Sequence, residues 1–204
     1  MDKRTTYSNG VELNNWDFSH KGAMTLRTAL VYSRNTTALQ TFKAVGETNI
    51  KSFLNNLDIQ IKNDGQDYLV ESNSIGADIS PIKMAAAYAA FGNYGTYSKP
   101  YTVTKVTTRD GQVTEFKPEQ KQAMKDSTAY MITDVLKDSF KYGFATQASI
   151  PGLPTAAKTG SSNYTVEQKR AMGASDYEDI IPDSWFIGYS TDYTISAWTG
   201  YDNP

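Results

Sequence analysis

Apolar residues recur at helical spacing through the first two thirds of the chain, and strand-like runs occupy the last quarter. The helical spacing predicts two helices within residues 24–45, the second ending at Gly46, and a third helix marked by Ile50, Phe53, Leu54 and Leu57. The first two are separated by Ser33-Arg34-Asn35-Thr36-Thr37, a stretch rich in helix-capping residues and poor in helix formers. We therefore expect Ser33 and Asn35 to lie in a tight connection between two helices.

A strongly apolar and therefore buried helix is predicted over residues 82–91. Ser80 stands at the expected N-cap position, Pro81 at the first helical position and Gly92 just past the end. After this helix, the dipeptide Asp110-Gly111 predicts the turn of a hairpin over about residues 100–117.

A further helix is expected to have Asp126 or Ser127 as its N-cap and to end at Gly143. Strand patterns then follow over residues 155–161, 184–189 and 193–201, the last two joined by a short turn. A helical part over about 24–145 followed by antiparallel strands over about 155–204 is an α+β order. We expect one domain spanning residues 1–204, with an antiparallel sheet packed on helices.

Composition narrows the possible functions. The chain has 204 residues, 39% hydrophobic and 12% aromatic, as in a globular protein. A net charge of -2 without a run of Lys or Arg gives no expectation of binding to nucleic acid or to a membrane surface. The absence of cysteine excludes thiol catalysis and Cys-based metal sites, and we expect no metal and no cofactor.

Two further absences matter. The single histidine, His20, lies in a polar stretch and is expected to be a solvated loop residue, so a Ser-His-Asp mechanism is not expected. No apolar run approaches the ~18 residues of a membrane span, and residues 1–6 lack the apolar core of a signal peptide. Any export signal or membrane anchor is expected outside these 204 residues.

Lys158-Thr159-Gly160 is the most specific short motif, because chance gives roughly 0.1 such triplets in a chain of this composition. On an edge strand, Lys158 supplies a positive charge and the following hydroxyl residues supply hydrogen-bond donors. Gly160 allows a substrate backbone to approach closely. The alternative is an ordinary strand.

Ser33-Arg34-Asn35 matches a Ser-x-Asn motif, but chance predicts roughly one match, and Ser161-Ser162-Asn163 is a second one. Taken alone, Ser33 and Asn35 are better explained as helix caps. Serine acyltransferases with Ser-x-x-Lys, Ser-x-Asn and Lys-Thr-Gly need the three motifs in that order. The first supplies the nucleophile and its base, and the others hold substrate and relay protons.

The chain's one Ser-x-x-Lys is Ser80-Pro81-Ile82-Lys83, which follows Ser33 where the nucleophile should precede it. A serine at a helix N-terminus with a lysine one turn on is a reasonable geometry for an activated nucleophile. Because the order is wrong and chance predicts roughly one match, we interpret Ser80 as a structural N-cap and a decoy. No nucleophile is therefore assigned within the chain.

Longer stretches resemble the class A (bifunctional) penicillin-binding proteins. Some of these stretches precede Ser33-Arg34-Asn35, and others cover the apolar helix and the turn after it. The rest include Lys158-Thr159-Gly160 and the strand patterns that follow it. The quoted stretches are Asn15-Trp16-Asp17, residues 25–30, 84–91, 95–100, 156–160, 183–189 and 197–204. The resemblance covers nearly the whole chain, and it departs from the family at residues 142–146, where relatives often have Gly-Thr-Gly. It implies the penicillin-binding transpeptidase or serine β-lactamase-like fold, with a helical subdomain and incomplete at its N-terminus.

The resemblance also implies roles for individual residues. Ser33 would relay a proton, and Asn35 would contact the catalytic lysine and the amide of a substrate or β-lactam. Lys158 and Thr159 would border the cleft beside Gly160. Ser161 would bind the substrate carboxylate and supply one backbone N–H of the oxyanion hole.

The implied activity is that of a D,D-transpeptidase, which cross-links peptidoglycan stem peptides through a serine acyl-enzyme and is acylated by β-lactams. The resemblance places its nucleophile before Met1, so these residues would be an inactive fragment. Its sheet would have an unpaired edge, and its stability would depend on the missing N-terminal part of the same domain. The parent protein would carry a glycosyltransferase domain and lie at the outer face of the cytoplasmic membrane of a Gram-positive bacterium.

Two other functions remain open. A non-catalytic module could keep the same fold and motifs as a scaffold or ligand sensor. A serine β-lactamase shares the motif order but needs a base that activates water. Of the seven Glu residues, only Glu12 has Asn three positions later, at Asn15, so a Glu-x-x-Asn pattern occurs once in the chain, ahead of Ser33.

Overall fold

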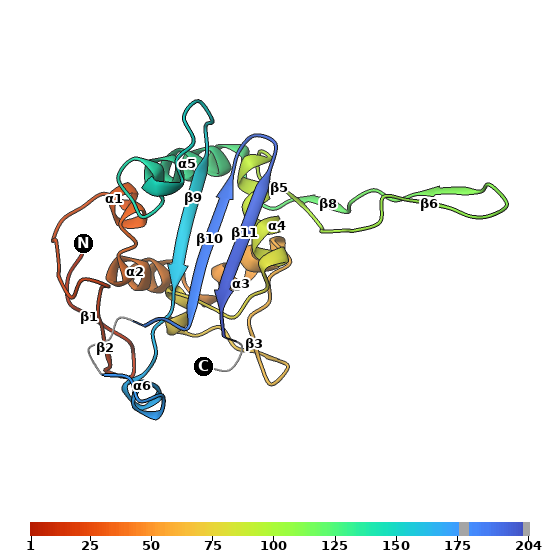
Figure 1. Ribbon diagram of the computed structural model, residues 1–204. Helices are drawn as coiled ribbons and strands as arrows, with labels where there is room; N and C mark the ends of the chain where they lie inside the picture. The colour runs from red at the N-terminus through yellow and green to blue at the C-terminus, as the bar shows by residue number, and fades with distance from the viewer. Residues whose placement is uncertain (176–179, 202–204) are drawn as a thin grey trace.

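The computed structural model describes residues 1–175 and 180–201. Its centre is a three-stranded antiparallel sheet in the order β11-β10-β9, formed by β9 (Ala156–Ser161), β10 (Asp183–Tyr189) and β11 (Thr194–Gly200). Figure 1 shows the larger helices gathered on one face of this sheet. The α+β class and the three strands, each within one residue of its expected bounds, are confirmed. Asp202-Asn203-Pro204, which carries part of the family resemblance, lies outside the described residues.

The helical layer contains five of the described helices: α1 (Leu26–Val31), α2 (Asn35–Val45), α3 (Glu47–Asn56), α4 (Pro81–Gly92) and α5 (Asp126–Lys137). The inner side of α4 buries Ala86, Ala87 and Ala90, and these small residues let the helix pack closely on its neighbours. Leu136 of α5 meets Ala156 and Tyr189 of the sheet in a second cluster. Phe91 packs against both clusters and so links them.

Helix ends differ from expectation in small, explicable ways. Gly46 ends α2 as predicted, with a φ of 81° that glycine adopts without strain. The helix predicted to reach Gly143 leaves the α form at Lys137 and continues as the 3₁₀ turn η2 (Asp138–Phe140). Such tightening is common at helix ends. Gly92 is the last residue of α4 instead of the residue after it.

Several short elements were not predicted. They are the two-stranded ladders β1 (Thr5–Thr6) with β2 (Glu12–Leu13), β3 (Lys62–Asn63) with β4 (Gln66–Asp67) and β5 (Thr96–Ser98) with β8 (Gln120–Gln122), together with η1 (Glu71–Ser74), η3 (Thr146–Ala148) and α6 (Val166–Ala171). Strands of two or three residues are too short to show an alternating pattern. The helix α6 is also short, with no residue of the helix buried, so no apolar stripe marks it.

The expected hairpin exists and projects from the body of the protein as an arm (Figure 1). Its strands are β6 (Lys105–Thr107) and β7 (Val113–Glu115), and all six of their residues are exposed. Gly111 has the φ of 84° that the predicted turn requires. Residues 101–104, predicted as strand, are not part of the ladder. No helix in the described ranges is long and apolar enough to cross a membrane.

Candidate active site

The turn between α1 and α2 presents Ser33. The chain leaves α1 at Tyr32, and the backbone N–H groups of Ser33 and Arg34 donate to Leu30 and Ala29 carbonyls at 3.1 and 2.9 Å. Ser33 has a φ of 50°, a left-handed conformation that costs a residue with a side chain about 1–2 kcal/mol. Strain of this kind persists where surrounding contacts fix the backbone, and it concentrates at functional sites.

Lys158 on β9 reaches this turn. Its Nζ donates to Ser33 Oγ at 2.9 Å and to the carbonyl of Thr159 at 2.7 Å. Lys158 shares a face of β9 with Ala156, which packs on Leu136 beneath the sheet. Its side chain therefore joins the sheet to the helical layer, and two motifs 125 residues apart in sequence meet through one hydrogen bond.

Burial lowers the pKa of Lys158 to about 8, because an ammonium group loses hydration in this layer. At neutral pH the amine still carries its proton for most of the time, and Ser33 Oγ accepts one of its N–H bonds. The hydroxyl proton of Ser33 is then left to point toward another partner. The pair can pass a proton outward through Ser33 and replace it from Lys158.

Asn35 differs slightly from its expected place, since it is the first residue of α2 and not part of the connection. The capping alternative for this motif is wrong: Arg34 occupies the N-cap position, and no side chain caps the helix there. The Nδ2 group of Asn35 donates to the carbonyl of Asn14 at 2.9 Å. This bond fixes the amide against the N-terminal segment, next to Ser33 on the same turn.

Thr159, Gly160 and Ser161 continue along β9, which has β10 on one side and is an edge strand within the described sheet. Gly160 and Ser161 are exposed. A Cβ on Gly160 would lie 3.4 Å from the Cβ of Trp185, close to ordinary contact distance. Contacts within the described chain therefore hardly require a glycine at this position. The exposed Gly160 leaves space for another backbone to approach β9.

A clasp formed by Ser162, Asp183 and Trp198 holds the chain just beyond Ser161. The indole N–H of Trp198 donates to Asp183 Oδ1 at 2.8 Å, and the Ser162 hydroxyl donates to Asp183 Oδ2. Asp183 therefore ties together the ends of β9, β10 and β11. Sequence reasoning missed this role, because nothing in Asp183-Ser184-Trp185 signals two partners from distant segments.

Ser80 and Lys83 are exposed at the start of α4. Ser80 occupies the N-cap position as expected, with a φ of -76° and a ψ of 149°, but its side chain makes no capping hydrogen bond. Neither residue hydrogen-bonds to the side chain of Ser33 or Lys158; these two bond to each other, and Lys158 also bonds to the carbonyl of Thr159. The structure thus does not join Ser80 to the site at β9.

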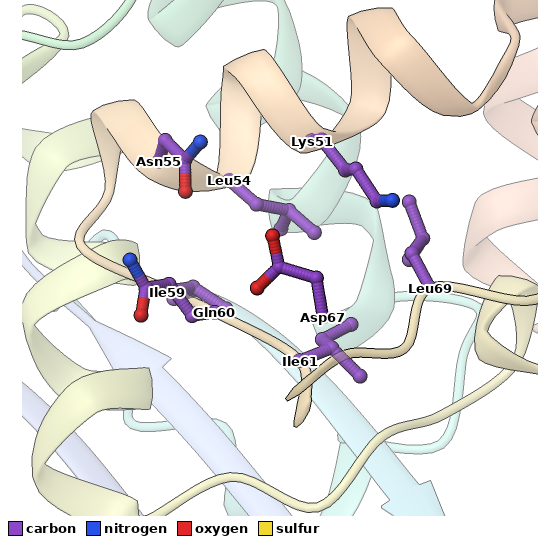
Figure 2. A pocket seen from close by; sticks show the side chains of 8 residues that line it. All are labelled: Lys51, Leu54, Asn55, Ile59, Gln60, Ile61, Asp67 and Leu69. Atoms are coloured by element: carbon purple, nitrogen blue, oxygen red, sulfur yellow. The ribbon is translucent and has the colours of Figure 1, made fainter. Parts of the chain in front are cut away.

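Two hollows on the molecule are lined by residues other than those of the candidate site. A cavity of about 30 Å³ beneath α3, lined by Lys51, Asp67 and six other residues, has room for about one water molecule (Figure 2). A wider groove of about 920 Å³ lies between the N-terminal segment, the end of α2 and residues 68–72. Among the described residues, no group of three or more His, Asp or Glu side chains is arranged to hold a metal ion.

The sequence matches the model of the family described as the penicillin binding protein transpeptidase domain over residues 1–202. Curated relatives include penicillin-binding protein 1A/1B of Bacillus subtilis, 42% identical over 98% of this chain and 22% of its own length. Penicillin-binding protein 1A of Streptococcus pneumoniae is 42% identical over 93% of this chain and 27% of its own length. The chain thus spans about a quarter of the length of these relatives.

Solved structures share the fold at low sequence identity. Penicillin-binding protein 1A of Haemophilus influenzae superposes with a TM-score of 0.78 at 17% identity, covering all of this chain and 34% of that one. The D,D-transpeptidase domain of a peptidoglycan glycosyltransferase from Eggerthella lenta gives 0.76 at 20% identity, covering all of this chain and 54% of that one. The fold and the resemblance to class A proteins are therefore confirmed. The chain belongs to the transpeptidase-domain family of the penicillin-binding proteins.

Proposed function

We propose that residues 1–204 form one wall of the active site of a D,D-transpeptidase that cross-links peptidoglycan. The nucleophile would come from a Ser-x-x-Lys motif in another segment of the same protein, because Ser80-Pro81-Ile82-Lys83 has the wrong order and no contact with the site. The observation that carries the proposal is the hydrogen bond from Lys158 Nζ to Ser33 Oγ. It joins the two motifs in an arrangement suited to proton relay.

The reaction has two balanced steps. The serine oxygen attacks the carbonyl of D-Ala-D-Ala, an ester forms, the peptide C–N bond breaks, and D-Ala leaves with a proton. An amine of a second stem peptide then attacks the ester, a new amide forms, and the serine regains its proton. We assign to Ser33 the transfer of the proton to the leaving nitrogen, and to Lys158 its replacement.

The remaining residues bind the substrate. Asn35 is held beside Ser33 by Asn14, so its Oδ1 can accept from a substrate amide. Thr159, Gly160 and Ser161 offer an edge strand along which an extended peptide can lie, and a cationic lysine stands at its base. Ser161 would contact the substrate carboxylate and contribute a backbone N–H to the oxyanion hole.

We propose that the protein lies outside the cytoplasmic membrane, where peptidoglycan is assembled, and that its source is a Gram-positive bacterium. Stem peptides would be its substrates and β-lactams its covalent inhibitors. An anchor and a glycosyltransferase domain would lie in other parts of the protein.

Labelling with fluorescent penicillin tests the proposal. A protein that carries both this chain and its Ser-x-x-Lys segment should be acylated, and Ser33→Ala or Lys158→Met should slow acylation by about 10²–10⁴-fold. Ser52→Ala, which changes an exposed serine on α3, should react like the wild type. The 204-residue chain alone should remain unlabelled.

Three outcomes would contradict the proposal or part of it. Absence of labelling in the longer protein would favour a non-catalytic module. Rapid turnover of a chromogenic cephalosporin would identify a β-lactamase. Labelling of the 204-residue chain that disappears in Ser80→Ala would show that Ser80 is a nucleophile and not a decoy.

A further inference from the structure

Arg34 stands between two candidate site residues, yet its side chain is only 2% exposed. The guanidinium group hydrogen-bonds to three residues of the N-terminal segment, Asp2, Asp17 and Ser19. Nε donates to Asp2 Oδ2 at 2.9 Å, Nη1 to Asp17 Oδ2 at 2.9 Å, and Nη2 to the carbonyl of Ser19 at 2.5 Å. Arg34 occupies the variable position of the Ser-x-Asn motif, yet its side chain has more hydrogen bonds than that of Ser33 or Asn35.

Asp2 extends this network to the far side of the motif. Its carboxylate, with no exposed side-chain surface, also accepts from Thr36 Oγ1 at 2.7 Å, from Asn15 Nδ2 at 2.7 Å and from the backbone N–H of Lys21 at 2.9 Å. Burial acts to raise the pKa of Asp2, but these hydrogen bonds together with the charge of Arg34 lower it to about 2. The buried carboxylate therefore stays charged at neutral pH and remains paired with Arg34.

The same network fixes the backbone that follows Ser33. The N–H of Arg34 is bonded to Ala29 at the end of α1, and its side chain is bonded to the N-terminal segment. Ser33 is strained at a φ of 50°, and among the described residues it is held by hydrogen bonds to Leu30 and Lys158. Without Arg34 the turn could relax, and the Ser33 hydroxyl would move away from Lys158.

We propose that Arg34 is a positioning residue, whose clamp by Asp2, Asp17 and Ser19 holds Ser33 against Lys158 and Asn35 beside it. This role rests on the proposed function: the Arg34 guanidinium would hold the site residues in place. Lysine cannot replace the planar fork of arginine, because its three N–H donors share one nitrogen, whereas arginine reaches its three partners from three nitrogens. The clamp acts through Ser33 and Asn35, and Arg34 itself does not touch the substrate.

A merely stabilising ion pair would behave differently, and α1 offers a matched control. Arg27 on α1 also bridges two carboxylates, those of Asp134 and Asp138, but its side chain is 43% exposed and contacts neither motif. Arg27→Lys should lower the thermal unfolding temperature without changing the site. Arg34→Lys should change the site as well.

Two readouts separate these roles. In the 204-residue chain labelled with ¹³C at lysine Cε, the Lys158 signal, assigned through Lys158→Arg, should titrate near 8 in the wild type and in Arg27→Lys. Arg34→Lys should move this midpoint toward 10.5, because a relaxed turn admits water to the amine. In the longer protein, Arg34→Lys should lower the acylation rate constant by up to about a hundredfold, with a smaller change in the dissociation constant of the initial complex.

The inference is overturned if Arg34→Lys lowers the unfolding temperature but leaves the Lys158 midpoint and the acylation rate constant unchanged. If Arg34→Lys does not fold, Asp17→Asn decides the question, since it removes the charge from one of the three partners of Arg34 and leaves Asp2 in place. Asp17→Asn should shift both readouts in the same directions by less, and wild-type values in it would overturn the inference. A longer protein that is never acylated refutes the proposed function, while the Lys158 titration still tests the clamp.

Discussion

At the scale of single residues, Lys158 places a charged amine where it is poorly hydrated and where it contacts Ser33. Its amine is partly buried between the sheet and the helices, where a charge is poorly hydrated, and two of its N–H groups are used by Ser33 and Thr159. An apolar side chain at this position would pack without that cost. A lysine here is therefore better explained by chemistry at Ser33 than by stability.

The lowered pKa of Lys158 predicts a pH dependence of stability. Between pH 8 and 10.5 the unfolded chain keeps the lysine proton while the folded chain has released it, so the free energy of unfolding should rise with pH. Below pH 8 both states are protonated and the contribution is constant. Across this interval the wild type should gain at most about 3 kcal/mol relative to Lys158→Met.

Urea denaturation of both proteins at pH 7, 8, 9 and 10 checks this prediction. Other groups that titrate in this interval affect both proteins equally and cancel in the difference. Lys137→Met, which changes an exposed lysine, should give a flat difference from the wild type. A flat difference for Lys158→Met would mean that the amine is hydrated in the folded state.

The sequence allowed Ser33, Asn35 and Lys158 to be named, because motif order and flanking stretches are local patterns. It did not predict the bond between Ser33 and Lys158, since a pairing across 125 residues depends on how the sheet packs against the helices. Arg34 was overlooked for a related reason. Its partners lie in an N-terminal loop without helical or alternating periodicity, and a charged residue in a polar stretch is normally solvated.

At the scale of elements, the central sheet depends on the clasp at Asp183. Asp183→Ala would leave the Trp198 indole N–H and the Ser162 hydroxyl without their partner. We expect a loss of about 1–3 kcal/mol in the free energy of unfolding, because half-buried donors would remain unsatisfied. Asp192→Ala, at the exposed turn between β10 and β11, should change stability by less than about 0.5 kcal/mol.

Chemical denaturation followed by tryptophan fluorescence measures both variants, since Trp198 and Trp185 lie 6.5 Å apart between ring centroids. Asp183→Ala should also change the folded-state emission, because the indole loses its acceptor. Equal stability of the two aspartate variants would mean that the clasp does not hold the sheet end.

The arm formed by β6 and β7 should be dispensable for folding. Its strands pair with each other, and the β5–β8 ladder at its base extends to a backbone hydrogen bond from Lys99 to Glu119 at 2.9 Å. Replacing residues 100–118 by Asn-Gly would close this ladder with a two-residue turn. The thermal unfolding temperature should stay the same or rise, because a shorter loop costs less entropy to close. A clear fall would reveal that the arm supports the body of the protein.

At the scale of the whole molecule, the three-stranded sheet has two free edges within the described ranges, β9 and β11. Only the β9 edge carries candidate site residues. The β9 edge carries Lys158 to Ser161 and faces the Ser33 turn. On β11, the bonds from Ser190 to Tyr193 and from Tyr201 to Pro182 fix the register, so the N–H and C=O groups of Thr194, Ser196 and Trp198 point away from β10. The sequence predicted an unpaired edge, and the structure locates a second one at β11.

An unpaired edge of seven residues is a template for another strand. We expect the 204-residue chain to self-associate with rising concentration through β11, and Ile195→Lys to prevent this by placing like charges on paired edges. Ile195 is 63% exposed, so its replacement should change the free energy of unfolding by less than about 0.5 kcal/mol. Ile150→Lys is the matched control, because Ile150 is 57% exposed but lies outside any strand.

Sedimentation velocity over a concentration series distinguishes the cases. The wild type and Ile150→Lys should shift together toward larger species, while Ile195→Lys should stay monomeric. If all three proteins sediment alike as monomers, the β11 edge is protected by its twist or by neighbouring chain. If all three associate alike, the contact lies elsewhere on the surface. Association that only Ile195→Lys abolishes would identify β11 as the edge at which another strand completes the sheet.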